Sequence, residues 1–398
     1  MTELQKIEQK LRKNNQEQII EEINKIEDKS KIINQIKEID FEQIKELYNL
    51  TKEEKKIQKS EIKPINYIDY WKLTKEQKDK YQKIGEQIIK SNQYAVITMA
   101  GGQGTRLGWK GPKGTYKLPI GEKGKYIFEI LVENIKKSKE QYNILPYWYI
   151  MTSKQNNEET IKFLEEHNYF GYEKEKVKFF EQDELPMLTE DGKIIVENNK
   201  IKTGSNGNGG IYFAMKKQEI IKDMKNKNIK WVYICGVDNI MVNPISPVFI
   251  GATIESNMQI ASKSVAKAYP DEKVGVFCKR NNKPSIVEYI ELSEKMRNEK
   301  DKNGELLYGE ANIISHLLNI EAIEKISNYN LNYHIAKKNG LYKFETFIFD
   351  GFEYFNDMLV MRVKREDEFA PIKNKEGVDS PKTATEIYER KAKEYAKN

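Results

Sequence analysis

The chain has 398 residues, 38% of them hydrophobic, and carries a formal net charge of +6. This length allows two or three domains with a sizeable core, and the positive charge is spread along the chain without the dense Lys/Arg block that indicates nucleic-acid binding. No apolar run approaches the roughly 20 residues of a membrane span, and the charged N-terminus is unlike a signal peptide, so we expect a soluble, cytoplasmic protein.

The first 60 residues contain no Gly or Pro, and their apolar residues recur at helical spacing. This pattern predicts a set of short amphipathic helices. Residues 74–90 form a further helical pattern, in which Thr74 is a plausible N-cap because Gln77 follows three residues later. We therefore predict a helical N-terminal region over residues 1–90.

A glycine-rich loop follows the first predicted strand. Tyr94–Met99 is a short apolar run of strand composition, and it leads into the sequence GGQGTRLG at residues 101–108. A strand followed by a glycine-rich turn presents backbone N–H groups to a phosphate, because glycine has no Cβ to block the approach. Arg106 and Lys113 add two cations to the same segment. We interpret this stretch as a phosphate-binding loop.

The loop matches neither of the two common phosphate-binding motifs. The dinucleotide fingerprint requires a third glycine where this chain has Leu107, and the P-loop requires a Gly-Lys-Ser/Thr triplet, which is absent. The motif therefore belongs to another class of phosphate-binding protein.

Strands and helices alternate after residue 94, which predicts a largely parallel sheet. Polar residues follow several of these strands: Gln182 follows 177–180, and Asp238 follows 231–235. Ligands bind outside the carboxyl ends of parallel strands, so one crevice is expected to hold the glycine-rich loop, Gln182 and Asp238. The other expected elements are strands at 147–151, 258–268, 343–349 and 359–363, a turn at 191–192, hairpin strands at 274–279 and 284–290, and helices at 125–137, 154–167, 210–224, 311–320 and 383–397.

The two cysteines, Cys235 and Cys278, lie in apolar runs. We expect them to be buried free thiols in a reducing compartment, since no metal-binding spacing involves them.

Several motifs occur in order over residues 90–375. They include MAGGQGTRLG, PKG, FFEQDELP, NGNGGIY, YICGVDNIMV, KVGVFCK, LLYGEANI and REDEFAPIKN. This series resembles the eukaryotic-type UDP-sugar pyrophosphorylases, in particular the UDP-N-acetylglucosamine (UDP-N-acetylhexosamine) pyrophosphorylase branch. The resemblance implies an α/β fold, in which a Rossmann-like nucleotidyltransferase mixed sheet is flanked by helices. It also implies a helical N-terminal region over 1–90, a catalytic domain over 91–345 and a short C-terminal region over 346–398.

The reaction that the resemblance implies is UTP plus N-acetylglucosamine 1-phosphate giving UDP-N-acetylglucosamine plus pyrophosphate, by in-line attack on the α-phosphate with Mg²⁺, or Mn²⁺ in its place. The attacking phosphate monoester has a second pKa near 6, so it needs no general base. Catalysis then consists of positioning and charge neutralisation. The expected partners are UTP and the sugar 1-phosphate, without nucleic acid or membrane; the oligomeric state stays open.

The resemblance also assigns roles to individual residues. The catalytic cations are Arg106, Lys113 and Lys373, and Asp238 binds the metal. The nucleotide-binding residues are Met99, Ala100, Gly101, Gly102, Gly104, Thr105, Gln182 and Gly207. The sugar-binding residues are Asn208, Gly275, Glu288, Tyr289 and Asn312.

The chain departs from the family pattern in two places. It ends soon after Lys373, so most of the C-terminal β-domain of larger members is expected to be missing. The family's Ala-Gly-Asn appears as Glu310-Ala311-Asn312. One alternative is the same chemistry on glucose, galactose or N-acetylgalactosamine 1-phosphate. The others are a non-catalytic nucleotide-sugar sensor and a scaffold that binds partners through residues 1–60. We expect the helices of residues 1–60 to pack on the central domain instead.

Overall fold

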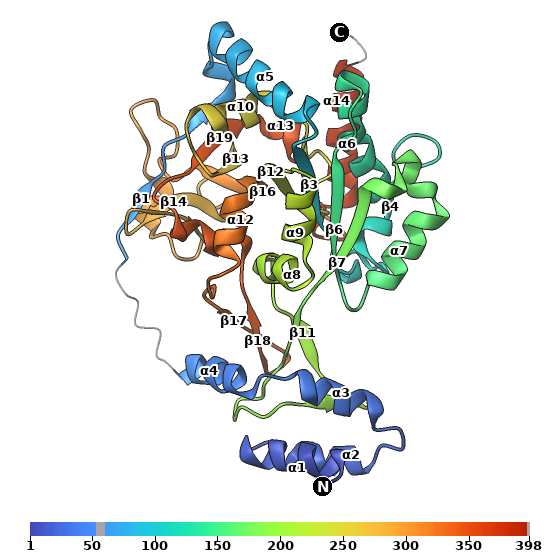
Figure 1. The fold of residues 1–398 in the computed structure, drawn as a ribbon. Helices are drawn as coiled ribbons and strands as arrows, with labels where there is room; N and C mark the ends of the chain where they lie inside the picture. The colour runs from blue at the N-terminus through green and yellow to red at the C-terminus, as the bar shows by residue number, and fades with distance from the viewer. Residues whose placement is uncertain (53–59, 396–398) are drawn as a thin grey trace. The chain divides into compact units, whose positions relative to one another are not determined.

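The computed structural model describes residues 1–52 and 60–395 and forms two compact units (Figure 1). The larger unit comprises Ser60–Gln182, Ile211–Asn330 and Phe349–Asn398, and the smaller one comprises Met1–Lys59, Asp183–Gly210 and Leu331–Ile348. The smaller unit thus combines the N-terminal region with two later excursions of the chain. The domain boundaries expected from the sequence, at residues 90 and 345, divide the chain differently and stay a prediction.

A mixed sheet forms the centre of the larger unit. Its strands are β1 (Ile62–Pro64), β2 (Ile68–Asp69), β3 (Tyr94–Met99), β6 (Tyr147–Ser153), β7 (Val177–Gln182), β12 (Trp231–Gly236), β13 (Ile260–Ala266), β14 (Val276–Arg280), β15 (Lys283–Val287), β16 (Glu310–Asn319) and β19 (Leu359–Val363). The main order is β2-β19-β13-β16-β12-β3-β6-β7, and β14 pairs with β1, β15 and β16. Because β12, β3, β6 and β7 are parallel, their carboxyl ends lie at one edge of the sheet.

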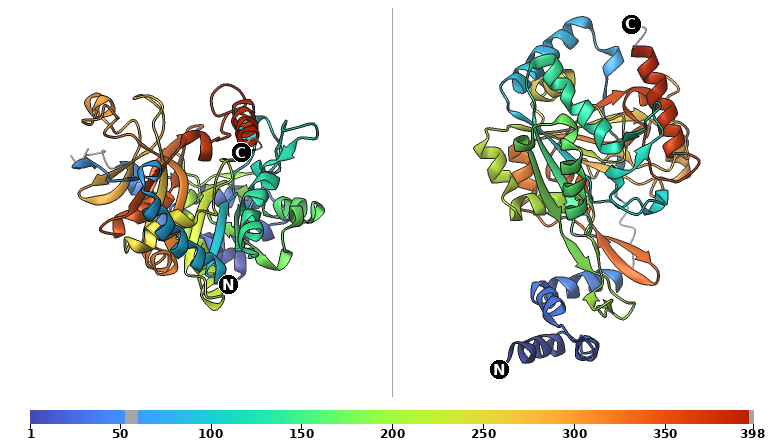
Figure 2. Two further views of the ribbon diagram at one scale, coloured as in Figure 1. Left: turned by 90° about the horizontal axis from the view of Figure 1, so that it is seen from above. Right: turned by 90° about the vertical axis from the view of Figure 1, so that its right-hand side faces the viewer.

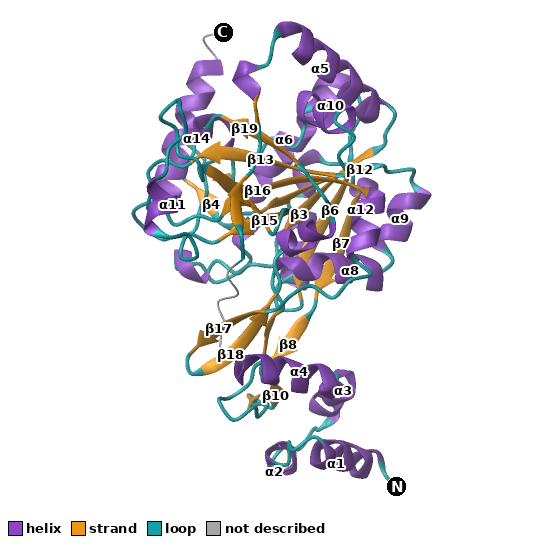
Figure 3. Cartoon of the chain, turned by 90° about the vertical axis from the view of Figure 1, so that its left-hand side faces the viewer, coloured by secondary structure: helices purple, strands orange, loops and turns teal. Residues whose placement is uncertain are grey.

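Helices accompany these strands (Figure 3). They are α5 (Lys75–Lys90), α6 (Ile127–Tyr142), α7 (Asn157–Glu166), α8 (Ile211–Lys217), α9 (Ile220–Asn226), α10 (Pro247–Glu255), α11 (Glu294–Asn298), α12 (Ile320–Ile326), α13 (Arg365–Glu368) and α14 (Pro381–Tyr395). A short hairpin, β4 (Lys117–Leu118) with β5 (Lys125–Tyr126), precedes α6. Among the helices described, none has the length and apolar character that crossing a bilayer requires.

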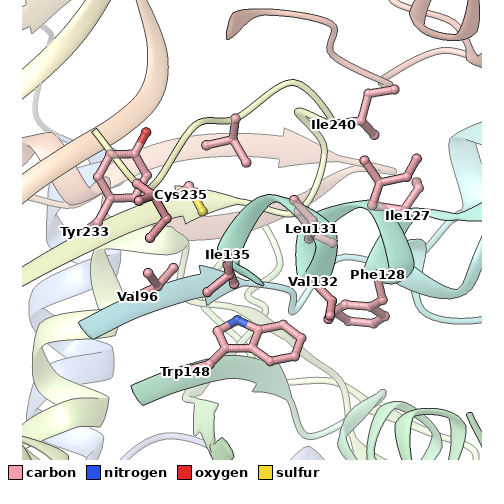
Figure 4. Packing of buried hydrophobic residues seen from close by; sticks show 14 of the residues in the cluster. Val96, Ile127, Phe128, Leu131, Val132, Ile135, Trp148, Tyr233, Cys235 and Ile240 are labelled. Atoms are coloured by element: carbon pink, nitrogen blue, oxygen red, sulfur yellow. The ribbon is translucent and has the colours of Figure 1, made fainter. Parts of the chain in front are cut away.

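The main core lies between the sheet and α6. Every residue of β3 and β12 is buried, as expected for central parallel strands that are covered on both faces. Figure 4 shows Leu131 and Ile135 of α6 among Val96, Trp148 and Tyr233 of the strands. Cys235 belongs to the same cluster, and both cysteines are buried and free, as predicted.

The C-terminal helix α14 lies beside α6, as the views in Figure 2 show. The Tyr388 hydroxyl donates a hydrogen bond to Glu133 Oε2 of α6 at 3.2 Å. A helix at the end of the chain therefore completes the larger unit. The predicted class is confirmed: an α/β protein with a mixed sheet, a helical N-terminal region and a short C-terminal extension.

The smaller unit has its own hydrophobic core. The helices α1 (Glu3–Lys13), α2 (Gln18–Asn24), α3 (Ser30–Glu38) and α4 (Phe41–Lys52) contribute isoleucine, leucine and phenylalanine side chains, which pack on Leu188, Ile194, Ile201 and Phe344. Those four residues belong to hairpin segments that contain β8 (Glu184–Pro186), β9 (Val196–Glu197), β10 (Lys200–Ile201), β11 (Thr203–Ser205), β17 (His334–Lys338) and β18 (Leu341–Glu345). The N-terminal helices thus pack on the excursions at 183–210 and 331–348.

Local signals in the sequence predicted several elements correctly. The strand at 94–99 has the predicted bounds. Thr74 and Gln77 form the expected capping box at the start of α5. The two predicted hairpin strands form β14 and β15, which are joined by a turn at 281–282. Both asparagines there have positive φ, at 51° and 63°, a conformation that asparagine adopts readily.

Two expected helices differ from the structure. The prediction of a helix at 311–320 is wrong, because these residues form β16 between β12 and β13. An apolar run that is buried on both faces has no clear period, so the pattern alone does not separate strand from helix. The helix expected at 210–224 is divided into α8 and α9 by Glu219, whose φ is 55°.

Candidate active site

The glycine-rich loop folds back on itself at the end of β3. Gly104 N–H donates to Gly111 O at 2.9 Å, Trp109 N–H donates to Gly104 O at 3.1 Å, and Lys113 N–H donates to Gly102 O at 3.0 Å. A methyl group at Gly104 would lie 2.7 Å from the Trp109 side chain, so this position requires glycine. Met99, Ala100 and Thr105 belong to the same strand-to-loop segment, and Thr105 begins a 3₁₀ turn that ends at Leu107.

Gln182 lies directly against this loop. It is the last residue of β7 and is only 6% exposed. A methyl group at Gly101 would approach its Nε2 to 2.6 Å, whereas one at Gly102 would meet no atom within 4 Å. The structure therefore brings the predicted nucleotide-binding amide of Gln182 and the glycine-rich loop together, with open space beside Gly102.

Asn156 fixes the loop and was not identified from the sequence. Its fully buried side chain donates to Ala100 O at 2.9 Å and accepts from Ser153 N–H at 2.8 Å. It thus connects the end of β6 to the start of the glycine-rich loop. The signal that pointed to Gln182 also applies here, since Asn156 follows a parallel strand at the same edge of the sheet.

Asp238 lies at the same edge, two residues after β12. In the sheet register, Gly236 at the end of β12 is opposite Met99 at the end of β3. The Asp238 carboxylate is half-buried, and no hydrogen bond or ion pair engages it within residues 1–52 and 60–395. The same ranges contain no group of three or more His, Cys, Asp or Glu side chains that could hold a metal. A cation here would therefore take few protein ligands.

The segment before Lys373 is bonded to the Asp238 loop. Ile372 N–H donates to Asp238 O at 2.8 Å, and the Lys113 ammonium donates to Ile372 O at 3.2 Å. Ile372 thus bonds to the Lys113 side chain through its C=O and to the Asp238 backbone through its N–H, and Lys373 is the next residue in the chain. Lys113, the predicted metal ligand Asp238 and the segment that carries Lys373 come from three distant parts of the sequence and meet at this junction.

The two lysines and Arg106 differ in their surroundings. The Lys373 ammonium is 3.6 Å from Asp379 Oδ2 and 5.8 Å from the centre of the Phe369 ring. Arg106 is exposed in the 3₁₀ turn, and no described residue bonds to its guanidinium. Arg106 is therefore available to an anionic ligand, whereas Lys373 is partly neutralised by Asp379.

Four of the predicted sugar-binding residues lie together in the larger unit. Asn312 N–H donates to Gly275 O at 2.9 Å, and a methyl group at Gly275 would lie 3.2 Å from Glu288 Oε1. Tyr289 follows Glu288 and is half-buried. Because Ser315 pairs with Cys235, Asn312 of β16 lies toward the edge of the sheet where β12 ends.

The sequence Glu310-Ala311-Asn312 departs from the family's Ala-Gly-Asn. The residues that differ, Glu310 and Ala311, belong to the core of the protein and not to the cluster of predicted sugar-binding residues. Ala311 is fully buried and packs with Val265 in a small hydrophobic cluster, and successive residues of a strand point to opposite faces. Its methyl group therefore lies on the face away from Asn312. Glu310 is buried as well, in an ion pair with Arg362 and a 2.6 Å hydrogen bond from Ser264.

Gly207 and Asn208 belong to the smaller unit. Gly207 has a φ of +85°, and a methyl group there would lie 2.2 Å from Thr346 O. Asn208 Oδ1 accepts a hydrogen bond from Ile348 N–H at 2.9 Å. Both residues are therefore held by the excursion at 331–348.

The sheet and its loop define an α/β nucleotidyltransferase. The family model described as UTP--glucose-1-phosphate uridylyltransferase matches residues 39–394, and the chain belongs to this family. It is 37% identical to UDP-N-acetylglucosamine diphosphorylase 2 of Arabidopsis thaliana over 78% of this chain and 67% of that protein. It is 35% identical to the UDP-N-acetylglucosamine pyrophosphorylase of Saccharomyces cerevisiae over 82% of this chain and 75% of that one.

A solved structure shows the same fold over nearly the whole chain. The uridine diphosphate N-acetylglucosamine pyrophosphorylase of Trypanosoma brucei, in complex with an inhibitor, superposes with a TM-score of 0.83 at 28% identity, covering 97% of this chain and 84% of that one. The predicted membership of the UDP-sugar pyrophosphorylases is confirmed.

Proposed function

We propose that the protein transfers the uridylyl group of UTP to N-acetylglucosamine 1-phosphate and releases pyrophosphate. The observation that carries this proposal is the junction at Ile372, which joins Lys113, Asp238 and the Lys373 segment beside the glycine-rich loop. Two cations and a carboxylate at the carboxyl edge of the sheet suit a triphosphate and its counter-ion. The relatives named for UDP-N-acetylglucosamine formation support the choice of sugar.

The chemistry requires positioning and charge neutralisation. A phosphate oxygen of the sugar 1-phosphate forms a bond to the α-phosphorus of UTP, and the bond from that phosphorus to the α,β-bridging oxygen breaks, so that pyrophosphate carries away the electron pair. The nucleophile is already mostly dianionic at pH 7. The protein therefore has to hold two polyanions in line and to neutralise the charge that develops on the leaving group.

The residues at the loop divide this work. Gln182 pairs with the uracil edge, and Met99, Ala100, Gly101 and Gly102 hold the nucleotide through their backbone. Gly104, Thr105 and Arg106 bind the β- and γ-phosphates. Lys113 binds near the α-phosphate, and Lys373 approaches the same phosphates once the ligand displaces Asp379 from its side chain. Gly207 is assigned to the nucleotide as well.

Asp238 fits a magnesium ion. Its half-buried carboxylate has no partner within the described residues, and a hard cation that keeps several waters and takes phosphate oxygens needs only one or two carboxylates from the protein. When bound, such an ion would neutralise phosphate charge. Mg²⁺ is the ion we propose, with Mn²⁺ as a substitute.

The sugar end is assigned to the cluster around Asn312. Glu288 accepts hydrogen bonds from sugar hydroxyls, and Tyr289 and Gly275 line the same place. The resemblance assigns Asn208 to the sugar as well. Glucose 1-phosphate is the second candidate substrate, because the description of the matching family model names it. The buried free thiols suit a reducing compartment, and we propose a cytoplasmic location.

The test is pyrophosphate release from UTP and Mg²⁺ with a panel of sugar 1-phosphates. We expect N-acetylglucosamine 1-phosphate to give the highest kcat/KM, ahead of the N-acetylgalactosamine, glucose and galactose forms. A preference for glucose 1-phosphate would retain the chemistry and change the substrate. No release with any of the four would contradict the proposed function and favour a sensor.

A further inference from the structure

A completely buried lysine lies behind the Asp238 loop. Lys263 of β13 has no exposed surface, and its ammonium donates to both oxygens of Glu368, at 2.9 and 2.7 Å, and to Asn243 O at 3.1 Å. An ammonium has three N–H donors, so each of them has an acceptor. The pair joins β13 to the end of α13 and to the loop that follows β12.

The same glutamate is bound a second time through its backbone. Asn239 Nδ2 donates to Glu368 O at 2.8 Å, and Asn239 Oδ1 accepts from Ala370 N–H at 3.0 Å. Lys263 and Asn239 thus hold residues 239–243 and 368–370 against each other from two directions. The next contact along both segments is the one from Ile372 N–H to Asp238 O, at 2.8 Å.

Stability alone does not account for a charged pair at this place. Well-packed apolar side chains of similar volume can replace a buried ion pair without loss of stability. An ion pair with every donor and acceptor occupied differs from an apolar contact in being directional, so it fixes the distance and orientation of the segments that it joins.

We propose that the Lys263–Glu368 pair is a positioning device that sets the spacing between the Asp238 carboxylate and the Lys373 ammonium at the pyrophosphate end of the site. This inference rests on the proposed function. Lys263 and Glu368 make no hydrogen bond to Gln182, Gly101 or Asn156 within the described residues. The device therefore acts on pyrophosphate and its metal, and leaves base recognition alone.

The experiment compares the wild-type protein with the double variant Lys263→Met/Glu368→Leu, which removes both charges together and leaves no unpaired ion in the core. Two quantities are measured. The first is the Kd for pyrophosphate in the presence of Mg²⁺, by calorimetric titration. The second is the ratio of kcat/KM for UTP to that for CTP. We expect the Kd to rise at least tenfold and the UTP/CTP ratio to stay within twofold.

Glu368→Asp provides a second variant in case the double variant does not fold. It keeps the pair but shortens one partner by a methylene group, and we expect a Kd increase of about threefold with a normal melting temperature. Asp223→Asn is the matched control, because Asp223 bonds to Tyr149, Lys178 and Lys227 without contacting either segment. Its pyrophosphate Kd should equal that of the wild type.

A folded variant that binds pyrophosphate like the wild type would overturn the inference. So would a UTP/CTP ratio that falls together with pyrophosphate affinity, since that result indicates general disorder of the site. If the wild-type protein turns over none of the sugar 1-phosphates in the panel, the proposed function itself is wrong. The panel therefore distinguishes failure of the proposed function from failure of this inference.

Discussion

Lys113 joins the glycine-rich loop to the Lys373 segment through its bond to Ile372 O at 3.2 Å. Lys113 is only partly buried and does not belong to the hydrophobic core, so removing its side chain opens no cavity there. We expect Lys113→Ala to lower kcat by about 100-fold or more, the usual effect of deleting a group that stabilises transition-state charge, with an unchanged melting temperature. The measurement is pyrophosphate release at saturating UTP.

Lys110 is the matched control for this prediction. It is an exposed lysine of the same loop without a bonding partner in the described part of the chain. Lys110→Ala should retain near-normal turnover. Equal losses in the two variants would mean that the loop responds to its total charge, and the specific role of Lys113 would be wrong.

His316 is a buried histidine outside the proposed chemistry. Its Nδ1 lies 2.7 Å from Ser262 Oγ, and burial lowers its pKa from 6.5 to about 3. Below pH 6.5 the unfolded chain binds a proton that the folded protein does not. His316 therefore lowers the free energy of unfolding as pH falls from 6.5 toward 3, by up to about 1.4 kcal/mol per pH unit.

A variant without this imidazole separates its contribution from those of the carboxylates. We expect the stability difference between wild type and His316→Gln to shrink by about 2 kcal/mol between pH 6.5 and 4.5. Urea unfolding at a series of pH values measures this difference. A constant difference over that range would mean that folding does not lower the pKa of His316.

Among the elements, the sequence predicted best where a local signal was strong. The strand at 94–99 lies between polar residues and a run of glycines, and its bounds were predicted correctly. Gln182 and Asp238 were identified because polar residues that end parallel strands meet at one edge. The strand β16 was missed because its pairing partners, β12 and β13, lie more than 40 residues away and leave no period in its own sequence. The contact of Asn156 with Ala100 and that of Lys263 with Glu368 were missed as well, because each joins residues that are far apart in the sequence.

The glycine-rich loop allows a comparison of two neighbouring positions. Gly101→Ala would place a methyl group 2.6 Å from Gln182 Nε2, whereas Gly102→Ala would place one in open space. We expect Gly101→Ala to lower the melting temperature and the preference for UTP over CTP, because Gln182 has to move. Gly102→Ala should melt like the wild type and weaken UTP binding only by occupying the space of the ligand.

Melting curves and UTP/CTP competition measure these effects. Equal melting temperatures and an unchanged preference in Gly101→Ala would show that Gln182 moves without consequence, and would remove it from base recognition. Normal UTP affinity in Gly102→Ala would show that the open space beside that residue does not receive the nucleotide.

At the scale of the whole molecule, the sequence predicted the fold class through the ordered motifs. It did not predict that residues 183–210 and 331–348 join the N-terminal helices in a separate unit. Those excursions contain short strands, whose apolar side chains pack on each other and on helices that lie more than a hundred residues earlier in the chain. No local pattern records such a contact.

The two units have hydrophobic cores that share no residue, so each is expected to open separately. Ile36 of α3 is fully buried in the smaller core, and Ile36→Ala should destabilise that unit by about 2–5 kcal/mol. Hydrogen exchange measures the opening of each segment. We expect faster exchange in α1–α4 and in the hairpins at 183–210 and 331–348, with unchanged protection in β3, β6 and β12.

The exposed neighbour Asn34 provides the control Asn34→Ala. Equal loss of protection in both units would show that they unfold as one, and would contradict the separation of the cores.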